Sequence, residues 1–177
     1  MDYNSLFTPY AEDKTIHTVI EIPMGSSNKI EYDRKIKVMR LDRVEPKIFA
    51  KPTNYGFIPG TLDDDGDELD TLVVTEEPLP TGVVVEANVI GVMEFEDDGE
   101  MDHKVICVPA DDRNTGNRIK TLADLGDQWV KQIEHHFSHY KDLKKPGSVK
   151  VLGFSEADKA HEIIAECIKR WNSEAEA

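Results

Sequence analysis

The chain has 177 residues, with 35 acidic and 21 basic side chains and a net charge of −14 at pH 7. This length corresponds to a single domain, residues 1–177, long enough to bury a core without disulfides or structural metals. The excess negative charge disfavours general binding to nucleic acid or to an anionic membrane surface.

The N-terminal residues show neither the basic start nor the apolar stretch of a signal peptide. No apolar run is long enough to cross a bilayer. Cys107 and Cys167 are far apart and each lies among apolar residues, a setting typical of reduced core thiols. We therefore expect a cytoplasmic protein.

Strands are predicted first along the chain. Apolar or alternating segments of strand length lie at residues 18–23, 29–33, 36–42, 72–75, 83–95 and 104–108. Turn signals such as Gly25-Ser-Ser-Asn28 separate them. Because no helix is predicted between these strands, the pattern indicates a meander, which a small closed barrel accommodates.

Two amphipathic helices are predicted after these strands. Apolar side chains recur every three or four residues from Trp129 to Tyr140 and, beyond a last strand at 149–152, from Ala160 to Trp171. Ser155 and Asp158 have the spacing of a capping box at the start of the second helix. We expect both apolar faces to pack on the barrel. The fold class is thus α+β, mainly β, with two flanking C-terminal helices.

Residues 63–70 place six carboxylates around one glycine and lead directly into a predicted buried strand. The plain interpretation of such a run is a solvated acidic loop. A loop that ends in a core strand instead favours convergence of Asp65, Asp67 and Asp70. Carboxylate oxygens of this kind form a site for hard divalent cations.

A second acidic turn contains Asp97 and Asp102. Alone it would be an ordinary hairpin turn. Beside the first cluster, however, two carboxylate groups can share a pair of metals about 3.5 to 4 Å apart. Four basic residues, each ordinarily a surface charge, could together hold phosphate oxygens: Lys29, Arg43, Lys104 and Lys141.

Seven segments together resemble the family I soluble inorganic pyrophosphatases of the short prokaryotic type. In order, they are Glu21-Ile-Pro23, Lys29-Ile-Glu-Tyr-Asp33, Leu41-Asp-Arg43, Asn54-Tyr-Gly56, Asp65-Gly-Asp-Glu-Leu-Asp70, the segment 97–104, and His139-Tyr-Lys-Asp-Leu143. The hexapeptide at 65–70 is the family's signature. The resemblance implies an OB-like five-stranded closed barrel that assembles as a cytoplasmic homohexamer.

The resemblance also implies the reaction, the hydrolysis of pyrophosphate to two orthophosphates, with Mg²⁺ as cofactor and Mn²⁺, Zn²⁺ or Co²⁺ as substitutes. Asp67 would be the general base beside a metal-activated water, and Glu21 would support the site. The implied metal ligands are Asp65, Asp70, Asp97, Asp102 and Glu31. The implied substrate-binding residues are Lys29, Arg43, Tyr55, Lys104, Tyr140 and Lys141.

Three segments depart from the family pattern: Ile30 stands where an aromatic is common, residues 34–37 lack the usual Thr-Gly turn, and residues 147–154 lack two tryptophans and a lysine. None of them contains a predicted metal ligand. We therefore expect changes in affinity or packing, with the reaction retained.

Two other functions stay open. One is a Mg²⁺-dependent hydrolase of small organic phosphates, which would use the same acidic cage. The other is an oligonucleotide-binding module, since OB-like barrels often have that function. Such modules normally have a basic groove with stacking aromatics, whereas this chain is acidic and only 7% aromatic.

The two histidines His135 and His139 stand four residues apart on a predicted helix, where they could bind a transition metal. No general-base Glu lies between them and no third ligand is evident. In related chains this helix lies at a subunit contact, which favours interface histidines whose protonation near pH 5 to 6 would loosen the oligomer.

Overall fold

The computed structural model describes residues 1–12, 14–114 and 116–175. Its strands are β1 (Thr15–Ile22), β2 (Asn28–Asp33), β3 (Val38–Val44), β4 (Asn54–Phe57), β5 (Asp70–Val73), β6 (Val84–Asp97), β7 (Glu100–Met101), β8 (Lys104–Pro109) and β9 (Val149–Glu156). The helices are α1 (Tyr3–Leu6), α2 (Asp127–His139) and α3 (Ala157–Ala175), with 3₁₀ turns η1 (Lys47–Phe49), η2 (Gly116–Arg118) and η3 (Leu122–Leu125).

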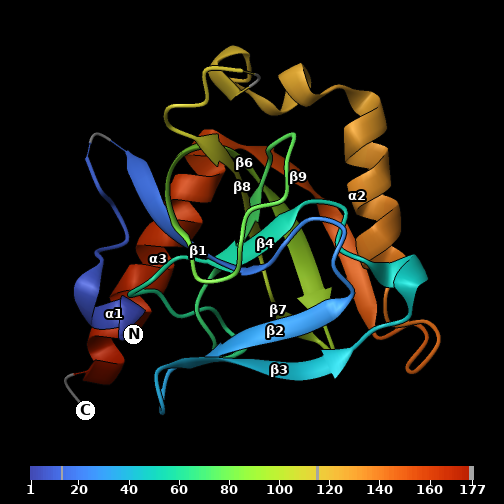
Figure 1. The fold of residues 1–177 in the computed structure, drawn as a ribbon, viewed down its shortest axis with the longest axis horizontal. Coiled ribbons are helices and arrows are strands. Elements are labelled where there is room, and N and C mark those ends of the chain that lie inside the picture. Colours follow the sequence, from blue (N-terminus) through green and yellow to red (C-terminus); the bar gives the residue numbers. More distant parts are fainter. Residues whose placement is uncertain (13, 115, 176–177) are drawn as a thin grey trace.

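Five strands form a closed ring in the order β1, β4, β5, β8 and β6, and β6 pairs back to β1. The ring closes because β6 is long: residues 84–88 pair with β1, residues 87–93 with β8, and residues 91–97 with β9. The helix α3 runs behind the ring, α2 lies at one side, and β2 and β3 form a separate hairpin across the front (Figure 1). The predicted mainly β, OB-like five-stranded fold with two C-terminal helices is confirmed.

The strand pairing differs from a simple meander. β5 pairs with β8 in parallel, with Asp70 opposite Lys104. The strand β4, absent from the predicted strands, links β1 to β5. A Cβ added at Gly56 in β4 would lie 2.0 Å from the carbonyl oxygen of Val19, so this close approach of β1 requires glycine.

Several predicted boundaries differ from the structure, and two of them have a clear physical reason. The strand expected from residue 36 begins at Val38, because Lys37 adopts a left-handed φ of 60° and its N–H donates to the Asp33 carbonyl in a turn. The capping box at Ser155 does not form. β9 continues through Glu156, and the Ser155 hydroxyl donates across the sheet to Glu94 at 2.6 Å.

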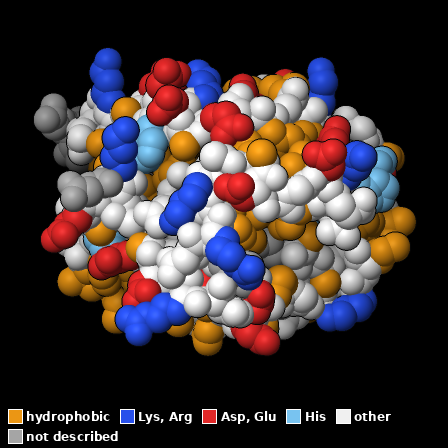
Figure 2. Space-filling view, turned by 90° about the horizontal axis from the view of Figure 1, so that it is seen from above, with side chains coloured by type: hydrophobic (Ala, Val, Ile, Leu, Met, Phe, Trp, Pro, Cys, Tyr) orange, Lys and Arg blue, Asp and Glu red, His pale blue; other side chains and the backbone are white. Residues whose placement is uncertain are grey.

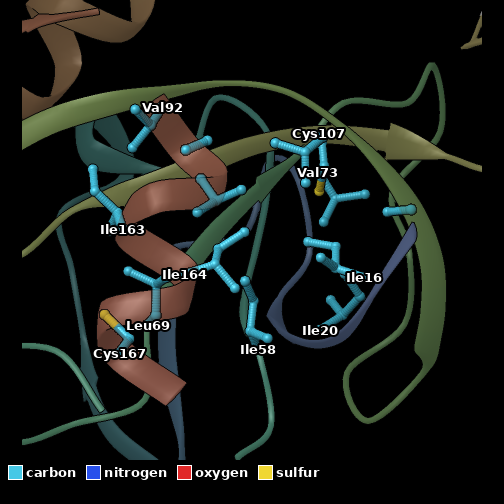
Figure 3. Close-up of a cluster of buried hydrophobic side chains, with 14 residues drawn as sticks. Ile16, Ile20, Ile58, Leu69, Val73, Val92, Cys107, Ile163, Ile164 and Cys167 are labelled. Atoms are coloured by element: carbon cyan, nitrogen blue, oxygen red, sulfur yellow. The ribbon is translucent and has the colours of Figure 1, made fainter. Parts of the chain in front are cut away.

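The apolar stripe of α3 packs on the ring, as predicted. Ile163, Ile164 and Cys167 lie against Leu69 and other apolar side chains of the strands (Figure 3). The stripe of α2 contributes Ile133 and Phe137 to a second buried cluster on another side of the ring. Both cysteines are buried and unpaired. Among the helices of the described ranges, none is both long and apolar enough to span a membrane.

Candidate active site

A cavity of about 420 Å³ opens between the β2–β3 hairpin and the ring. It collects charged and phenolic side chains from distant parts of the sequence. Most of the predicted site residues line it: Glu21, Lys29, Glu31, Tyr55, Asp65, Asp67, Asp70, Asp97, Asp102, Tyr140 and Lys141. Residues up to 120 positions apart in sequence therefore meet in one place.

At the base of the cavity, Lys104 lies between two acids. Its Nζ donates to Asp70 at 2.6 Å and also to Asp102. Burial lowers the pKa of Lys104, but the attraction of Asp102 and Asp70 outweighs burial and raises that pKa above its ordinary value. Lys104 is almost fully buried and is not itself part of the cavity lining.

Asp70 is the acid most enclosed by this network. The Tyr55 hydroxyl and the Lys104 ammonium both donate to its Oδ2. Burial raises the pKa of Asp70 to about 7, against the opposing attraction of Lys104. Burial raises the pKa of Glu21 well above its usual range, and the nearby Asp70 adds to this rise. Additional positive charge nearby would therefore favour the ionised form of both acids.

The acidic loop is shaped by a turn at Gly66, whose φ of 88° favours glycine. The Asp67 N–H donates to Asp65 Oδ1 at 3.0 Å, and the Arg34 guanidinium donates to the Gly66 carbonyl at 2.8 Å. Burial raises the pKa of Asp65 to about 6. Asp67 lines the cavity, and within the described ranges its carboxylate accepts no hydrogen bond.

Asp97 stands on the opposite wall, held by residues just beyond α2. Its Oδ2 accepts hydrogen bonds from the Tyr140 hydroxyl at 3.3 Å and from the Lys141 ammonium. Its Oδ1 is buried and has no hydrogen-bond partner among the described residues. Such an unpaired buried oxygen calls for a ligand.

Of the two predicted substrate-binding residues on the β2–β3 hairpin, one lines the cavity and the other does not. Lys29 lines the cavity and pairs with Glu31. Arg43, opposite Lys29 in the β2–β3 register, is held by Glu45 at 2.5 Å and Asp42 at 2.6 Å. It lines a small adjoining recess, outside the cavity lining. The substrate role of Arg43 stays a prediction.

Some cavity residues were not predicted from the sequence. Arg34, Lys35 and Arg40 add positive charge along the hairpin wall. Lys51 lines both the cavity and the recess of Arg43. A lysine three residues before the Asn54-Tyr-Gly56 segment carries no periodic signal, and only its proximity to that segment could have indicated it.

The donor set fits a hard divalent cation. The cavity acids offer carboxylate oxygens only, and neither His nor Cys lines the cavity within the described residues. In the same ranges, no three His, Cys, Asp or Glu side chains lie at metal-ligand spacing. Asp70, Asp97 and Asp102 are each paired with a lysine. The raised pKa values of Asp65 and Asp70 and the unpaired oxygen of Asp97 all favour added positive charge.

The histidine pair of α2 lies outside this cavity. The rings of His135 and His139 are 4.6 Å apart, and His139 Nδ1 lies 2.8 Å from Asp142 Oδ2. With no metal-spaced group among the described residues, the transition-metal interpretation gains no support. The interface interpretation stays a prediction.

On the face seen in Figure 2, acidic and basic side chains are interspersed with apolar ones. This mixed distribution, with an overall charge of −14, is unlike the basic groove of a nucleic-acid-binding module.

The chain is similar to known proteins over nearly its whole length. The family model described as inorganic pyrophosphatase matches residues 18–172. Inorganic pyrophosphatases of Neisseria meningitidis serogroup B and Haemophilus influenzae are 62% and 60% identical, covering 98% and 97% of this chain and 99% and 98% of their own.

Solved structures give the same result. The inorganic pyrophosphatase of Neisseria gonorrhoeae has a TM-score of 0.94 at 61% identity, covering 97% of this chain and 99% of its own. That of Thermus thermophilus has a TM-score of 0.89 at 40% identity, with the same coverage of both chains. The chain belongs to the inorganic pyrophosphatase family.

Proposed function

We propose that this protein hydrolyses pyrophosphate to two orthophosphates with Mg²⁺ as cofactor. The observation that carries the proposal is the single cavity in which acids on one loop face lysines and tyrosines from distant segments. Relatives about 60% identical over nearly the whole chain bear the name inorganic pyrophosphatase, which supports the same activity here.

Five acids would hold the metal: Asp65, Asp70, Asp97, Asp102 and Glu31. When bound, Mg²⁺ supplies a water of lowered pKa and positive charge for phosphate oxygens. Mn²⁺, Zn²⁺ or Co²⁺ would serve as substitutes, because these ions also bind to carboxylate oxygens.

The chain's own groups position the substrate and take the proton. Lys29, Arg43, Lys104 and Lys141 supply cations, and Tyr55 and Tyr140 supply hydroxyl donors, for the phosphoryl oxygens. As the water oxygen bonds to one phosphorus, Asp67 accepts its proton, and the bridging P–O bond breaks to release the other orthophosphate. Alignment and charge are the main requirements of this reaction.

We also propose a homohexamer in the cytoplasm. The support is a set of exposed apolar side chains on and beside β3: Ile36, Val38, Leu41, Val44 and Ile48. Sedimentation equilibrium should give about six times the 20.0 kDa of one chain. A monomer at micromolar concentration would contradict the assembly. Sedimentation at pH 8 and pH 5 tests whether His135 and His139 loosen it.

The activity is tested by phosphate release from pyrophosphate with Mg²⁺ and with excess chelator. We expect metal-dependent release that Asp67→Asn lowers by at least about a hundredfold, as for loss of a general base. The control is Asp111→Asn, which removes the same charge from an exposed side chain outside the cavity. Unchanged release by the Asp67 variant would remove Asp67 from this role.

The alternative substrate class is tested in the same assay. Small organic phosphates, each with a bulky group on one phosphoryl oxygen, should be hydrolysed far more slowly than pyrophosphate. Equal rates would favour the broader phosphohydrolase.

A further inference from the structure

Lys51 occupies a fixed position at the junction of the cavity and the adjoining recess. Its backbone is tied to the turn after β1: the Lys51 N–H donates to the Ser26 carbonyl at 2.9 Å, and its carbonyl accepts from the Gly25 N–H at 2.8 Å. The backbone N–H and the carbonyl of Lys51 are thus both hydrogen-bonded. The position of its Cα is therefore fixed before any ligand binds.

Three aromatic rings surround the end of this side chain. Lys51 Nζ lies 4.3 Å from the centroid of the Tyr55 ring, 5.0 Å from that of Phe137 and 5.1 Å from that of Tyr140. The rings attract a cation through their faces, but they accept no strong hydrogen bonds. Two of the three rings belong to residues already predicted to hold substrate.

Three other lysines of the site are paired with acids, whereas Lys51 is not. Lys29 pairs with Glu31, Lys104 with Asp70 and Asp102, and Lys141 with Asp97. Within the described ranges, Lys51 Nζ has no carboxylate at ion-pair distance and no hydrogen-bond acceptor. Its three donor positions are therefore free for a ligand.

The charges around Lys51 also favour the binding of an anion. Burial, with the repulsion of Lys104 and Lys29, lowers the pKa of Lys51 to about 7 against the opposing attraction of Asp70 and Asp102. An anion beside Lys51 would favour its charged form. Phosphate oxygens carry that charge and accept hydrogen bonds.

We propose that Lys51 is a substrate-binding residue whose ammonium donates hydrogen bonds to a phosphoryl group of pyrophosphate. This inference rests on the proposed function. The ring cage holds the ammonium in place, and the substrate supplies the acceptors that the protein does not. Lys51 thus adds affinity for the bound anion, while Asp67 remains the proton acceptor.

The first test is Lys51→Met, which keeps an apolar side chain against the three rings and removes the charge. With pyrophosphate and Mg²⁺, we expect KM to rise about 10- to 100-fold, the range of a hydrogen bond to a charged group, with kcat within about threefold of wild type. The matched control is Lys47→Met, on an exposed lysine of the same segment, which should leave KM unchanged.

A merely structural Lys51 gives a different pattern. The unfolding temperature of Lys51→Met would then fall while KM stayed at the wild-type value, and that result would overturn the proposal. If wild-type protein released no phosphate from pyrophosphate, the proposed function would fail before the variant was considered.

A second measurement uses wild-type protein and does not depend on the variant folding. Trace acetylation near pH 7.5, followed by peptide mass spectrometry, compares the labelling of Lys51 and Lys47 with and without orthophosphate and Mg²⁺. We expect orthophosphate to protect Lys51 several-fold and to leave Lys47 unaffected. Equal labelling of Lys51 in both conditions would contradict phosphate binding at this residue.

Discussion

Neighbouring residues on the paired strands β5 and β8 belong to two contrasting regions. Leu69, immediately before β5, and Val105 in β8 are fully buried in the apolar cluster beneath α3. The adjacent Asp70 lines the cavity and pairs with Lys104, which lies beneath the lining. Side chains alternate between the two faces of a strand, so one backbone serves both regions.

The two regions are held together by different interactions. The core depends on close apolar packing, and the cavity depends on pairing between opposite charges with raised acid pKa values. The comparison teaches that stability and ligand binding can be changed separately, even through adjacent residues.

The largest effect is expected from Lys104→Met, which removes the cation shared by Asp70 and Asp102. Loss of one partner of a buried ion pair lowers the free energy of unfolding by about 3 to 5 kcal/mol. Urea unfolding of wild type and variant without metal measures this loss. The control is Lys145→Met, at an exposed pair with Asp98, which should leave the transition almost unchanged. Similar shifts in both variants would mean that the cavity charges are not coupled as described.

On the core side, Ile164→Ala should lower the free energy of unfolding by about 2 to 5 kcal/mol, because the fully buried side chain leaves a cavity. Denaturant unfolding measures the loss. Since Ile164 does not line the active cavity, KM for pyrophosphate should stay at the wild-type value at a temperature where the variant is folded. A large change in KM would show that the two regions are not separable.

Addition of Mg²⁺ should stabilise the folded protein through the cavity alone. Magnesium at about 100 times its Kd should stabilise the folded protein by about 2.7 kcal/mol, through binding to the native state alone. Thermal unfolding with Mg²⁺ and with chelator measures the gain. Ile164→Ala should show the same gain as wild type, and Asp70→Asn should show much less. A full gain in Asp70→Asn would remove this acid from the predicted metal ligands.

The smallest effect concerns pH. Burial, together with the repulsion of Lys51 and His135, lowers the pKa of His136 to about 3, while the unfolded chain keeps an ordinary pKa of 6.5. The unfolded state therefore binds more protons, and this contribution to stability is lost as pH falls below 6.5. Between pH 7 and 5.5, His136→Phe should lose about 1 kcal/mol less stability than wild type. Urea midpoints of both proteins at the two pH values give the difference. Equal losses of stability in wild type and His136→Phe would contradict this prediction.

Several predictions from patterns local in sequence are confirmed. The apolar spacing of α2 and α3 predicted which faces are buried, and the acidic runs around Asp67 and Asp102 predicted a shared site. These succeeded because the relevant information lies within a few residues of each position.

Features that depend on distant backbone were missed. The parallel pairing of β5 with β8 and the insertion of β4 beside β1 are set by closure of the ring, and no local pattern distinguishes them from a meander. Lys51 was overlooked because its environment comes from Phe137 and Tyr140, more than 80 residues away. Ser155 was assigned to a helix cap, yet pairing of β9 with β6 gave its hydroxyl a partner across the sheet.

The parallel register that places Asp70 opposite Lys104 also has a kinetic consequence. Two parallel strands cannot be joined by a tight hairpin. The connection between β5 and β8 must therefore return along the whole length of β5 before the two strands can pair. Contacts of such long sequence separation slow folding, because the entropy of loop closure is lost before they form. In a refolding experiment, we expect catalytic activity to return with the slowest structural phase, and any earlier compact species to be inactive.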